Sequence, residues 1–584
     1  MKRLWGFAAF CSMVLANLTL SPVMAQVPSN SKHLKVSIIP EPVKAVPGIN
    51  SYRINKNTVI VASGEEQLKS AKFLKDYILK HYDVELSIIP ATDAKGKEIK
   101  IKKNKEAEIK HVVFDIKPLA YGIAGFSPSD LKKTGAYTLN TKDGILNLTG
   151  ANPEGLFYAV QTLIQLLPST VPQLGLFDKY LQIPVQEIEI VDYPRFQYRG
   201  MHLDVVRHIF PVEYIKQYID YLALHKLNYF HWHLTDDQGW RMESKAYPKL
   251  NEIGSWRAGT IIGLFPGTGV DSTRYGGYYT IEQMKDIVKY AADRYITIVP
   301  EIDIPGHSMA IISAYPELST TPDIPKQPAI TWGIFNRQNN VLLPSEQTFK
   351  FLKDVFNELM DIFPGEYIHV GGDECSPIWW RDSRETQAFM KNYGIKDETE
   401  LQGYFLKRVY DVVKARGRKL VGWDEIMESP SYLAKDMVVM SWRDARHGWK
   451  AAEMGHKTII ASVNQHYFNT AQRKDETALC HKNFFVPLDS VYYFEPIPDI
   501  YNSAYEENIL GGEGCMWTEY FPDKAAVEYA IFPRMSAFSE VYWSQSKNKN
   551  WPKFMLKLVE QFNRYDLWGA GYCTYIFESG HYSR

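Results

Sequence analysis

The chain has 584 residues, of which 45% are hydrophobic and 23% charged, and its formal net charge is −1. This composition is ordinary for a globular protein, and the length allows more than one domain. The balanced charge excludes a global electrostatic attraction for nucleic acid or for an anionic membrane surface.

The first residues have the form of a secretory signal. Lys2 and Arg3 precede an apolar run over 4–20, and Ala25 offers a small residue for cleavage. We therefore expect residues 1–25 to be removed and the protein to be exported to the periplasm, the cell surface or the medium. The alternative is a membrane anchor, but the run is shorter than a typical span of about 20 residues. No later segment is apolar enough to form a stable membrane span.

Four cysteines remain after the signal, at Cys375, Cys480, Cys515 and Cys573. They are widely scattered, and none belongs to a C-x-x-C pair that would suggest zinc. We therefore expect thiols rather than a disulfide scaffold.

Residues 33–190 predict a smaller α+β domain. β-rich runs lie at 36–39, 58–62 and 84–89, a hairpin is expected over 136–148, and helical apolar spacing occurs at 65–81 and 153–167. No constellation of catalytic residue types occurs in this region.

Residues 192–575 alternate between short apolar strands and amphipathic helices. The eight expected strands lie at 197–205, 229–234, 296–302, 367–370, 419–422, 437–441, 458–462 and 509–515. This alternation predicts an α/β fold, a (β/α)8 TIM barrel with loop insertions. A doubly wound open sheet is the alternative, but no Gly-rich dinucleotide or phosphate loop follows any strand.

Polar and aromatic residues follow seven of the eight expected strands. In chain order they include Arg207, Asp236, His307, Asp373 with Glu374, Trp423, Trp442, and Trp517 with Glu519. Because the chemistry of a parallel barrel lies at the carboxyl ends of its strands, we expect these side chains to meet in one site.

The adjacent carboxylates Asp373 and Glu374 indicate glycosidic chemistry. Cleaving a glycosidic bond needs an acid for the leaving oxygen and an anionic or nucleophilic group for the oxocarbenium-like centre. Neighbouring residues that leave a strand point in different directions, so one could face the leaving group and the other the underside of the sugar. Taken alone, the dipeptide is also compatible with a helix cap and a structural ion pair.

A metal centre is the competing interpretation of the histidines and acids. His231, His233, Asp236, Asp303 and His307 are ligand types, but no H-E-x-x-H pattern occurs. We expect instead a hydrogen-bonded relay in which His307 and Asp236 orient Glu374, with no metal and no cofactor.

These motifs resemble glycoside hydrolase family 20, the β-hexosaminidases. The resemblance rests on the segments 199–208, 233–240, 301–307, 371–374, 422–423 and 517–519, and it covers about 192 to 570. It implies an exo-acting β-N-acetylhexosaminidase, a hydrolase that removes terminal non-reducing β-linked N-acetylglucosamine, or alternatively N-acetylgalactosamine, from a glycan. It also implies a smaller α+β domain before the barrel.

The resemblance implies a role for each matching residue. Glu374 would be the general acid and base, and Asp373 would orient the 2-acetamido group, whose oxygen attacks C1 to give an oxazolinium. This is substrate-assisted retaining catalysis, favoured because a tethered nucleophile has a high effective concentration. The remaining implied residues are Tyr467 at the acetamido oxygen, Trp423, Trp442 and Trp517 as pocket walls, Arg207 and Glu519 at sugar hydroxyls, and His307 and Asp236 behind Glu374.

One position departs from the family pattern. Where many relatives have Tyr-x-Asp, this chain reads Tyr467-Phe468-Asn469, with Arg473 nearby. A neutral Asn469 beside a cation would tolerate an anion, so one alternative is a sulfoglycosidase that prefers 6-O-sulfated N-acetylglucosamine. The simpler alternative is that Asn469 keeps the hydrogen bond that Asp makes in the relatives.

Two further functions stay open at this point. A retaining glycosidase could use Asp373 as a covalent nucleophile and would not need the acetamido group. A non-catalytic carbohydrate-binding protein could use the same barrel, but its expected mark is the loss of the acid, whereas Glu374 is present.

Overall fold

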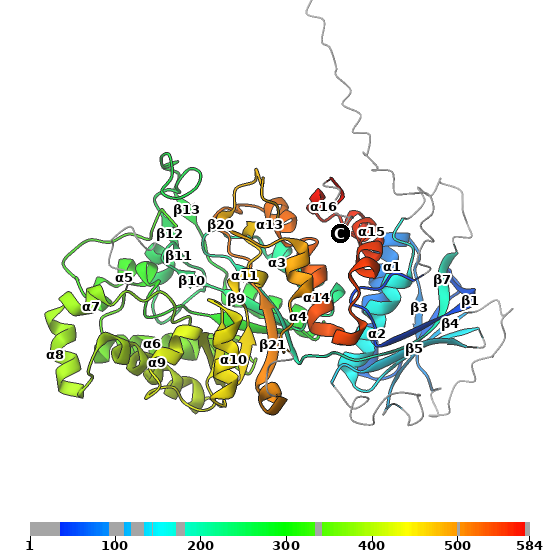
Figure 1. Cartoon of the computed structure of the whole chain (residues 1–584), viewed down its shortest axis with the longest axis horizontal. Coiled ribbons are helices and arrows are strands. Elements are labelled where there is room, and N and C mark those ends of the chain that lie inside the picture. The colour runs from blue at the N-terminus through cyan, green and yellow to red at the C-terminus, as the bar shows by residue number, and fades with distance from the viewer. Residues whose placement is uncertain are drawn as a thin grey trace, which may run out of the picture. The chain divides into compact units, whose positions relative to one another are not determined.

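The computed structural model describes residues 36–92, 110–117, 119, 134–142, 144–170, 182–332, 341–498 and 503–578. The expected signal, residues 1–25, lies outside the described residues. Two sheet systems dominate the fold (Figure 1).

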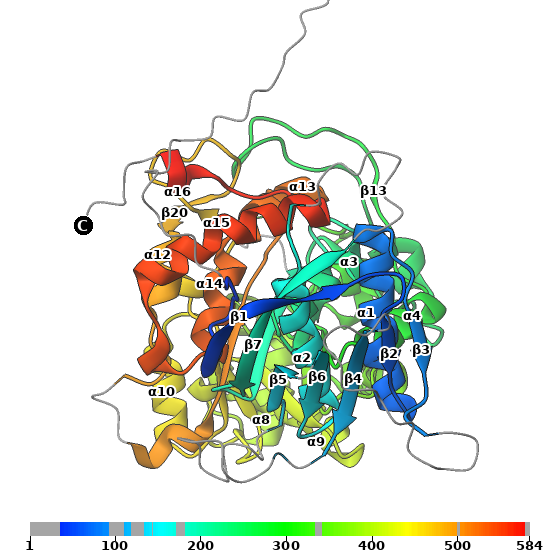
Figure 2. The ribbon, with the colours of Figure 1, turned by 90° about the vertical axis from the view of Figure 1, so that its right-hand side faces the viewer.

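The first is a seven-stranded sheet in the order β1-β7-β5-β6-β4-β2-β3, seen in that order from left to right in Figure 2. Its strands are β1 (Lys44–Ile54), β2 (Val59–Val61), β3 (Ser87–Ile89), β4 (His111–Ile116), β5 (Tyr137–Lys142), β6 (Ile145–Gly150) and β7 (Ile183–Asp192). Pairing is antiparallel from β1 to β6 and parallel from β6 to β3. Helices α1 (Glu65–Tyr82) and α2 (Pro153–Leu166) pack on this sheet.

Both helices and the β5–β6 hairpin were expected from the sequence, but the strand expected at 36–39 is wrong. The backbone N–H of Ile39 donates to Gln165 Oε1 at 2.8 Å, and Gln165 Nε2 donates to the Ile39 carbonyl at 2.6 Å. Ile38 and Ile39 are each 1% exposed. The apolar run therefore reflects burial against α2 rather than pairing in a sheet.

The second system is a closed barrel of eight parallel strands, which confirms the predicted TIM-barrel class. The strands are β8 (Tyr198–Asp204), β9 (Tyr229–His233), β14 (Thr297–Glu301), β15 (Tyr367–His369), β16 (Lys419–Trp423), β17 (Val438–Ser441), β18 (Thr458–Ile460) and β21 (Ile509–Gly514). Each overlaps one of the eight expected segments, and closure through β21 and β8 excludes the open-sheet alternative.

Helices separate most of the barrel strands, and N-capping residues in the sequence mark where several of these helices begin. The Ser345 hydroxyl accepts from Thr348 N at the start of α6, and Thr280 and Gln283 form a reciprocal capping box at the start of α4. Among the described residues from β8 onward, the helices of eight residues or more are α3 (Val212–Leu224), α4 (Ile281–Ala292), α6 (Glu346–Ile362), α8 (Arg384–Tyr393), α9 (Glu398–Ala415), α10 (Ala445–Glu453), α13 (Lys524–Ile531), α14 (Arg534–Trp543) and α15 (Trp551–Trp568).

Short elements fill the loops beyond the carboxyl ends of the strands. The strand pairs are β10 (Thr235–Asp236) with β11 (Gly239–Trp240), β12 (Trp256–Arg257) with β13 (Tyr275–Gly276), and β19 (Thr470–Ala471) with β20 (His481–Phe485). The short helices are α5 (Met309–Ala314), α7 (Ile378–Asp382), α11 (Val463–His466) and α12 (Leu488–Tyr493), and α16 (Tyr575–Glu578) ends the described chain. These insertions supply side chains to the site described below.

A buried carboxylate joins the seven-stranded sheet to the barrel. Asp192, the last residue of β7, accepts at Oδ2 from Tyr137 OH at 2.6 Å, from Lys226 Nζ at 3.0 Å and from Trp543 Nε1 at 3.0 Å. Asp192 and Lys226 are both 0% exposed. Two of the donors belong to the barrel part of the chain, so this ion pair fixes the contact between the two sheet systems.

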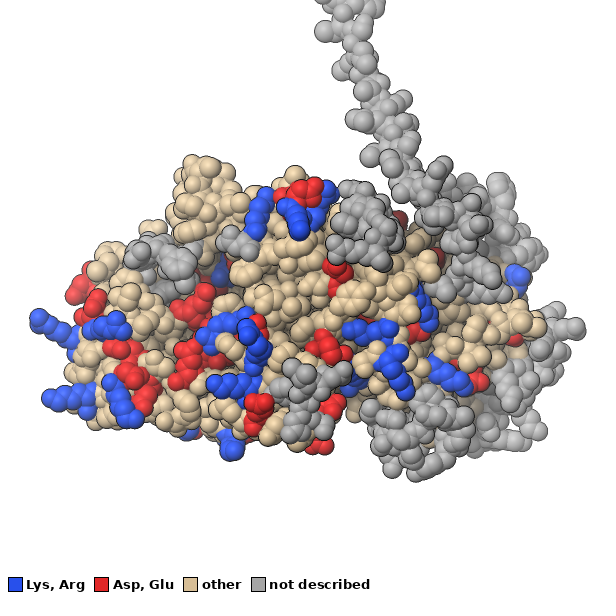
Figure 3. Space-filling view, viewed as in Figure 1, with Lys and Arg blue, Asp and Glu red and all other residues tan. Residues whose placement is uncertain are grey.

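The face of the molecule in Figure 3 shows no large patch of a single charge sign. On the face shown in Figure 3, basic and acidic side chains are interspersed, in keeping with the net charge of −1. No helix in the described part of the chain has the length and apolar character that a membrane crossing requires. The four described cysteines form no disulfide, as expected.

Candidate active site

A cavity of about 200 Å³ lies at the carboxyl ends of the barrel strands. It is lined by Arg207, His307, Asp373, Glu374, Trp442, Val463, Tyr467, Asn469, Thr470, His481, Phe484, Trp517 and Glu519. Nine of the twelve site residues expected from the sequence are in this set. The other three are Asp236, Trp423 and Arg473.

A glycine turn brings the two adjacent carboxylates into the cavity. After β15 the chain passes through Gly371 at φ 66° and Gly372 at φ 92°, a region that favours glycine, and Glu374 itself has φ 48°. A Cβ on Gly371 would lie 1.7 Å from Asp303 Oδ1. The turn therefore needs glycine both for its dihedral angles and for space.

His307 lies between the two carboxylates and a deeper acid. Its Nδ1 is 3.0 Å from Asp236 Oδ1, and its Nε2 is 3.4 Å from Glu374 Oε2 and 3.6 Å from Asp373 Oδ2. Burial lowers the pKa of His307, but the charges of Asp236 and Asp303 outweigh it and raise that pKa well above its usual value. The protonated form of the imidazole is therefore favoured, and its Nε2 lies within ion-pair distance of both carboxylates without a hydrogen bond to either. His307 is hydrogen-bonded to Asp236, but its Nε2 makes no hydrogen bond to Glu374, so the expected relay as far as Glu374 stays a prediction.

Asp236 lies beneath the cavity and anchors Arg207. The distance from Arg207 Nη2 to Asp236 Oδ2 is 2.7 Å, and Arg207 Nε donates to Gln238 Oε1 at 2.8 Å. The Arg207 guanidinium lies over the Trp517 ring at 5.0 Å. Burial raises the pKa of Asp236, but the charges of Arg207 and His307 hold it well below its usual range. Arg207 is thus fixed in direction before any ligand binds.

Three buried oxygen atoms around the cavity lack a hydrogen-bond partner within the described protein. They are Asp373 Oδ1, Asn469 Oδ1 and Glu519 Oε2. Burial raises the pKa of Asp373 above its usual value, against the opposing charge of His307. Because buried polar atoms are normally paired, these acceptors indicate a ligand that brings N–H or O–H donors.

Aromatic rings form the walls of the cavity. The Trp442 and Tyr467 rings stack at a centroid distance of 6.1 Å, and the Tyr467 and Trp517 rings are 6.5 Å apart. Trp442 Nε1 donates to Glu425 Oε2 at 2.9 Å. Trp423, expected as a third wall, is 1% exposed and lies behind Trp517 at a ring distance of 6.1 Å. It supports the wall from inside the barrel and does not line the cavity.

A buried charge network fills the barrel below the cavity. Glu301 accepts from Trp423 Nε1 at 3.0 Å and from His233 Nδ1, and it lies 3.0 Å from His369 Nδ1. Burial lowers the pKa of His233, but the charge of Glu301 and the hydrogen bonds to carboxylates raise it to about 10. The carboxylate of Glu301 is therefore balanced by protein donors.

Some of these side chains are close enough together to hold a cation. The groups within the described residues are His202 with His231 and Glu301; Asp236 with Asp303 and His307; His307 with Asp373 and Glu374; and Glu301 with Asp303 and Asp373. Three of the four groups include Glu301 or Asp236, whose charges histidines and Arg207 already offset. The prediction that the site works without a metal stays a prediction.

The loop after β18 contains one residue that was expected in the cavity but lies outside it. It also contains lining residues that were not predicted from the sequence. Arg473 lies outside the cavity, with its Nε and Nη2 each 2.6 Å from the Asp475 carboxylate. His481 and Phe484 line the cavity instead. His481 Nε2 is 3.2 Å from Glu519 Oε1; burial alone would raise the pKa of Glu519, but His481 lowers it to about 2. No sequence motif marks these two residues, because they reach the cavity through an inserted strand pair.

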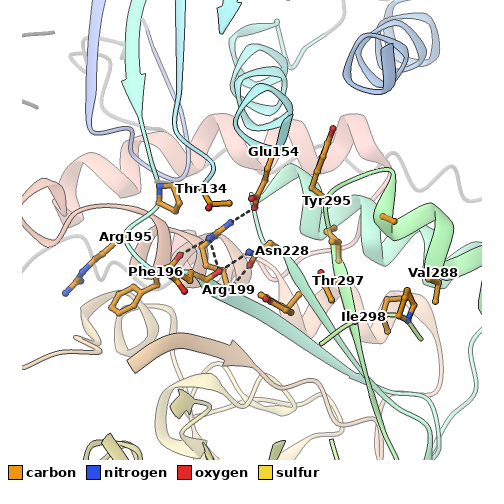
Figure 4. Close-up of a pocket in the computed structure, with 17 residues that line it drawn as sticks. Thr134, Glu154, Arg195, Phe196, Arg199, Asn228, Val288, Tyr295, Thr297 and Ile298 are labelled. Atoms are coloured by element: carbon orange, nitrogen blue, oxygen red, sulfur yellow. Dashed lines mark hydrogen bonds and ion pairs between the residues drawn. The ribbon is translucent and has the colours of Figure 1, made fainter. Parts of the chain in front are cut away.

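A second cavity, of about 870 Å³, is larger but lies at the opposite, amino-terminal end of the barrel strands (Figure 4). The Arg199 side chain at its centre donates to Tyr158 OH at 2.7 Å and to the Phe196 carbonyl at 2.8 Å, and lies 4.0 Å from Glu154. None of the expected site residues lines this cavity. The smaller cavity is therefore the candidate active site.

Comparison with known proteins gives a consistent result. Residues 196–546 match the family model described as glycosyl hydrolase family 20, catalytic domain, and residues 35–193 match its domain 2. A β-hexosaminidase from Porphyromonas gingivalis is 36% identical over 98% of this chain and 68% of that protein.

Solved structures give the same picture. A family 20 exo-β-N-acetylglucosaminidase from Vibrio harveyi, in complex with N-acetylglucosamine, has a TM-score of 0.77 at 27% identity, over 93% of this chain and 79% of the other. A β-N-acetylhexosaminidase from Bacteroides fragilis has a TM-score of 0.71 at 26% identity, over 92% of this chain and 96% of the other.

Proposed function

The chain belongs to glycosyl hydrolase family 20 and is a β-hexosaminidase, and from this premise we propose that it releases single terminal N-acetylhexosamine residues by substrate-assisted catalysis. The observation that carries the proposal is that Asp373 and Glu374 both lie within ion-pair distance of His307 in a cavity that is open at one side. The sugar that we propose is N-acetylglucosamine, which the Vibrio harveyi neighbour holds in its solved complex.

The attacking group is the acetamido oxygen of the substrate. Asp373 Oδ1 is buried and without a partner, so it can accept the acetamido N–H and orient the carbonyl oxygen toward C1. Attack by this oxygen breaks the bond from C1 to the leaving oxygen and gives an oxazolinium, whose positive charge the Asp373 carboxylate stabilises. A tethered nucleophile avoids the entropic cost of positioning a separate one.

Glu374 supplies the proton to the leaving oxygen. Its side chain is 38% exposed, at the mouth of the cavity, where the leaving group must lie. In the second half of the reaction the carboxylate takes a proton from water, which attacks C1 and reopens the ring. The configuration at C1 is inverted twice and is therefore retained.

The geometry disfavours Asp373 as a covalent nucleophile. One oxygen of Asp373 and one of Glu374 lie within 4.8 Å of each other and of His307. A retaining enzyme with a carboxylate nucleophile places its two carboxyl groups about 5–5.5 Å apart, across the scissile bond. Asp373 and Glu374 are adjacent in the chain and both lie near His307, unlike two carboxylates placed opposite each other across the bond.

The test is release of an aryl alcohol from an aryl β-N-acetylglucosaminide and from the matching aryl β-glucoside, which lacks the acetamido group. We expect turnover of the first substrate only, with retention at C1 by NMR. The Glu374→Gln variant should lose at least about a hundredfold in kcat/KM, the low end for general acid–base catalysis.

Glu366→Gln is the matched control, because Glu366 forms an exposed ion pair with Lys419 at the amino end of the barrel. Equal turnover of the glucoside would refute substrate assistance. Absence of any Glu374-dependent turnover would favour the carbohydrate-binding alternative.

Sulfated substrates are not part of the proposal. The cation that would favour them, Arg473, is paired with Asp475 outside the cavity. Running the 6-O-sulfated aryl substrate in the same assay checks this point, and we expect it to be turned over more slowly than the plain form. Faster turnover would restore the sulfoglycosidase alternative and its assignment to Asn469.

A further inference from the structure

The cavity has a buried interior and an open mouth. Arg207, Asp373, Tyr467 and Trp517 are between 6% and 9% exposed. Phe484, which lines the same cavity, is 44% exposed. A sugar held in the interior would be covered on most sides, whereas the group attached to its C1 would extend past Glu374 toward the mouth.

An irregular strand pairing directs the Phe484 side chain to this mouth. In the β19–β20 pair Thr470 is opposite His481, but the next residue, Ala471, is opposite Phe485. The extra residues on β20 break the usual alternation of side chains, as in a β-bulge. His481 and Phe484 consequently both line the cavity, while Phe485, which is 41% exposed, does not.

An exposed phenylalanine at this place has a specific physical consequence. Single exposed apolar residues are common and need no explanation. This ring, however, shares a cavity with the candidate acid and leaves nearly half of its surface in water. The C–H face of a pyranose would cover that surface and remove apolar area from water.

We propose that Phe484 is the platform for the second sugar of the substrate, the ring that carries the leaving oxygen. This inference rests on the proposed function and extends it from the terminal residue to its neighbour. The occupant is a neutral pyranose that presents its C–H face to the aromatic ring. Phe484 thereby favours oligosaccharides over glycosides with a small aglycone.

The test uses a binding measurement that does not depend on turnover. A sulfur-linked disaccharide of N-acetylglucosamine, which resists hydrolysis, is titrated into the full-length protein by calorimetry, beside the free monosaccharide. Phe484→Ala should weaken disaccharide binding about tenfold, equivalent to about 1.4 kcal/mol. It should leave the monosaccharide affinity within about twofold, because that ligand occupies the interior only.

Phe485→Ala is the matched control, since the neighbouring ring is equally exposed but lies outside the cavity. It should change neither affinity, and Phe484→Tyr should retain disaccharide binding. Equal effects of the two alanine variants, or an equal loss for both ligands in Phe484→Ala, would overturn the proposal.

Turnover by the unmodified protein separates this inference from the proposed function. If the natural disaccharide is not hydrolysed while Phe484→Ala still weakens binding selectively, the reaction assignment fails and the platform stands. If hydrolysis occurs and Phe484 has no selective effect, the platform fails and the reaction stands. With hydrolysis, kcat/KM for the disaccharide should fall about tenfold in Phe484→Ala, and that for the methyl glycoside should not.

Discussion

Glu425 binds the wall residue Trp442 and lies close enough to Asp373 for the two carboxyl groups to interact electrostatically. It accepts from Trp442 Nε1, and burial, together with the charges of Asp373 and Asp424, raises its pKa to about 8. A protonated carboxyl still accepts a hydrogen bond through its carbonyl oxygen. Glu425 can therefore hold the Trp442 indole without placing a second negative charge beside Asp373.

This raised pKa makes a prediction for stability. The unfolded chain loses the Glu425 proton near pH 4.3, and the folded protein keeps it to about pH 8. The contribution to stability is thus full below the unfolded pKa and is lost as the pH rises toward the folded pKa. Glu425→Gln cannot ionise, so its melting temperature relative to the unmodified protein should rise by about 2 °C or more between pH 5 and pH 8. Calorimetry at both pH values measures this difference in melting temperature. Glu453→Gln, at an exposed position, is the control and should show no such trend.

Asp373 makes a prediction for activity. In the mechanism that we propose, Asp373 must be ionised to stabilise the oxazolinium, and burial raises its pKa. Activity should therefore fall as the pH drops through that pKa. Asp373→Asn should lower kcat about a hundredfold or more, as expected for loss of one charge-stabilising group. It should also lose the acidic limb of the pH–rate profile, and persistence of that limb in the variant would assign it to another group.

At the scale of the element, the turn after β15 is the least replaceable segment. Gly371 and Gly394 have nearly the same backbone angle, φ 66° and 67°. A Cβ would lie 1.7 Å from Asp303 at Gly371 but would meet nothing within 4 Å at Gly394. The two positions therefore separate backbone strain from a steric clash.

Gly371→Ala should cost more than about 3 kcal/mol in stability and abolish detectable activity, because the clash displaces Asp373 and Glu374. Gly394→Ala, at the end of α8, should cost only about 1 kcal/mol, the strain of a left-handed residue, with full activity. Denaturant unfolding and the aryl assay measure both. Similar costs at the two sites would mean that the Asp303 side chain moves aside freely.

The barrel was predictable from sequence because its strands are buried on both faces and end in polar residues. Each expected strand was a short apolar run, and the acids, His307 and the tryptophans after the runs marked the carboxyl ends. β1, β4 and β7 were missed, and β1 leaves Val46 and Ile49 exposed, so it lacks the pattern of a buried strand.

Side-chain direction was the part that sequence could not supply. Trp423 was expected in the pocket wall but lies behind it, since its indole N–H binds Glu301 inside the barrel. Arg473 was expected beside Asn469 but pairs with Asp475. His481 and Phe484 reach the cavity through an irregular strand pairing that no local motif encodes.

At the scale of the whole molecule, the buried Asp192–Lys226 pair joins the two sheet systems and should contribute strongly to the free energy of unfolding. Asp192→Asn leaves Lys226 charged, buried and without its carboxylate, which should cost about 3 kcal/mol or more. Glu189→Gln removes an exposed ion pair with Lys44 in the same sheet and should cost less than about 1 kcal/mol. Urea unfolding followed by circular dichroism compares them, and equal midpoints would show that the pair contributes no more than a surface contact.

The size of the active-site cavity determines that the effective substrate concentration is the concentration of chain ends, not of sugar residues. Arg207 and Asn469 line the cavity at 6% and 2% exposure, and the volume of about 200 Å³ suits one sugar ring. A polymer can then enter only by its tip, and each visit removes one residue. For a fixed mass of glycan, the reaction rate is proportional to the number of accessible non-reducing ends. Cutting every chain in half doubles that number. A group that blocks the non-reducing end protects the whole chain from hydrolysis.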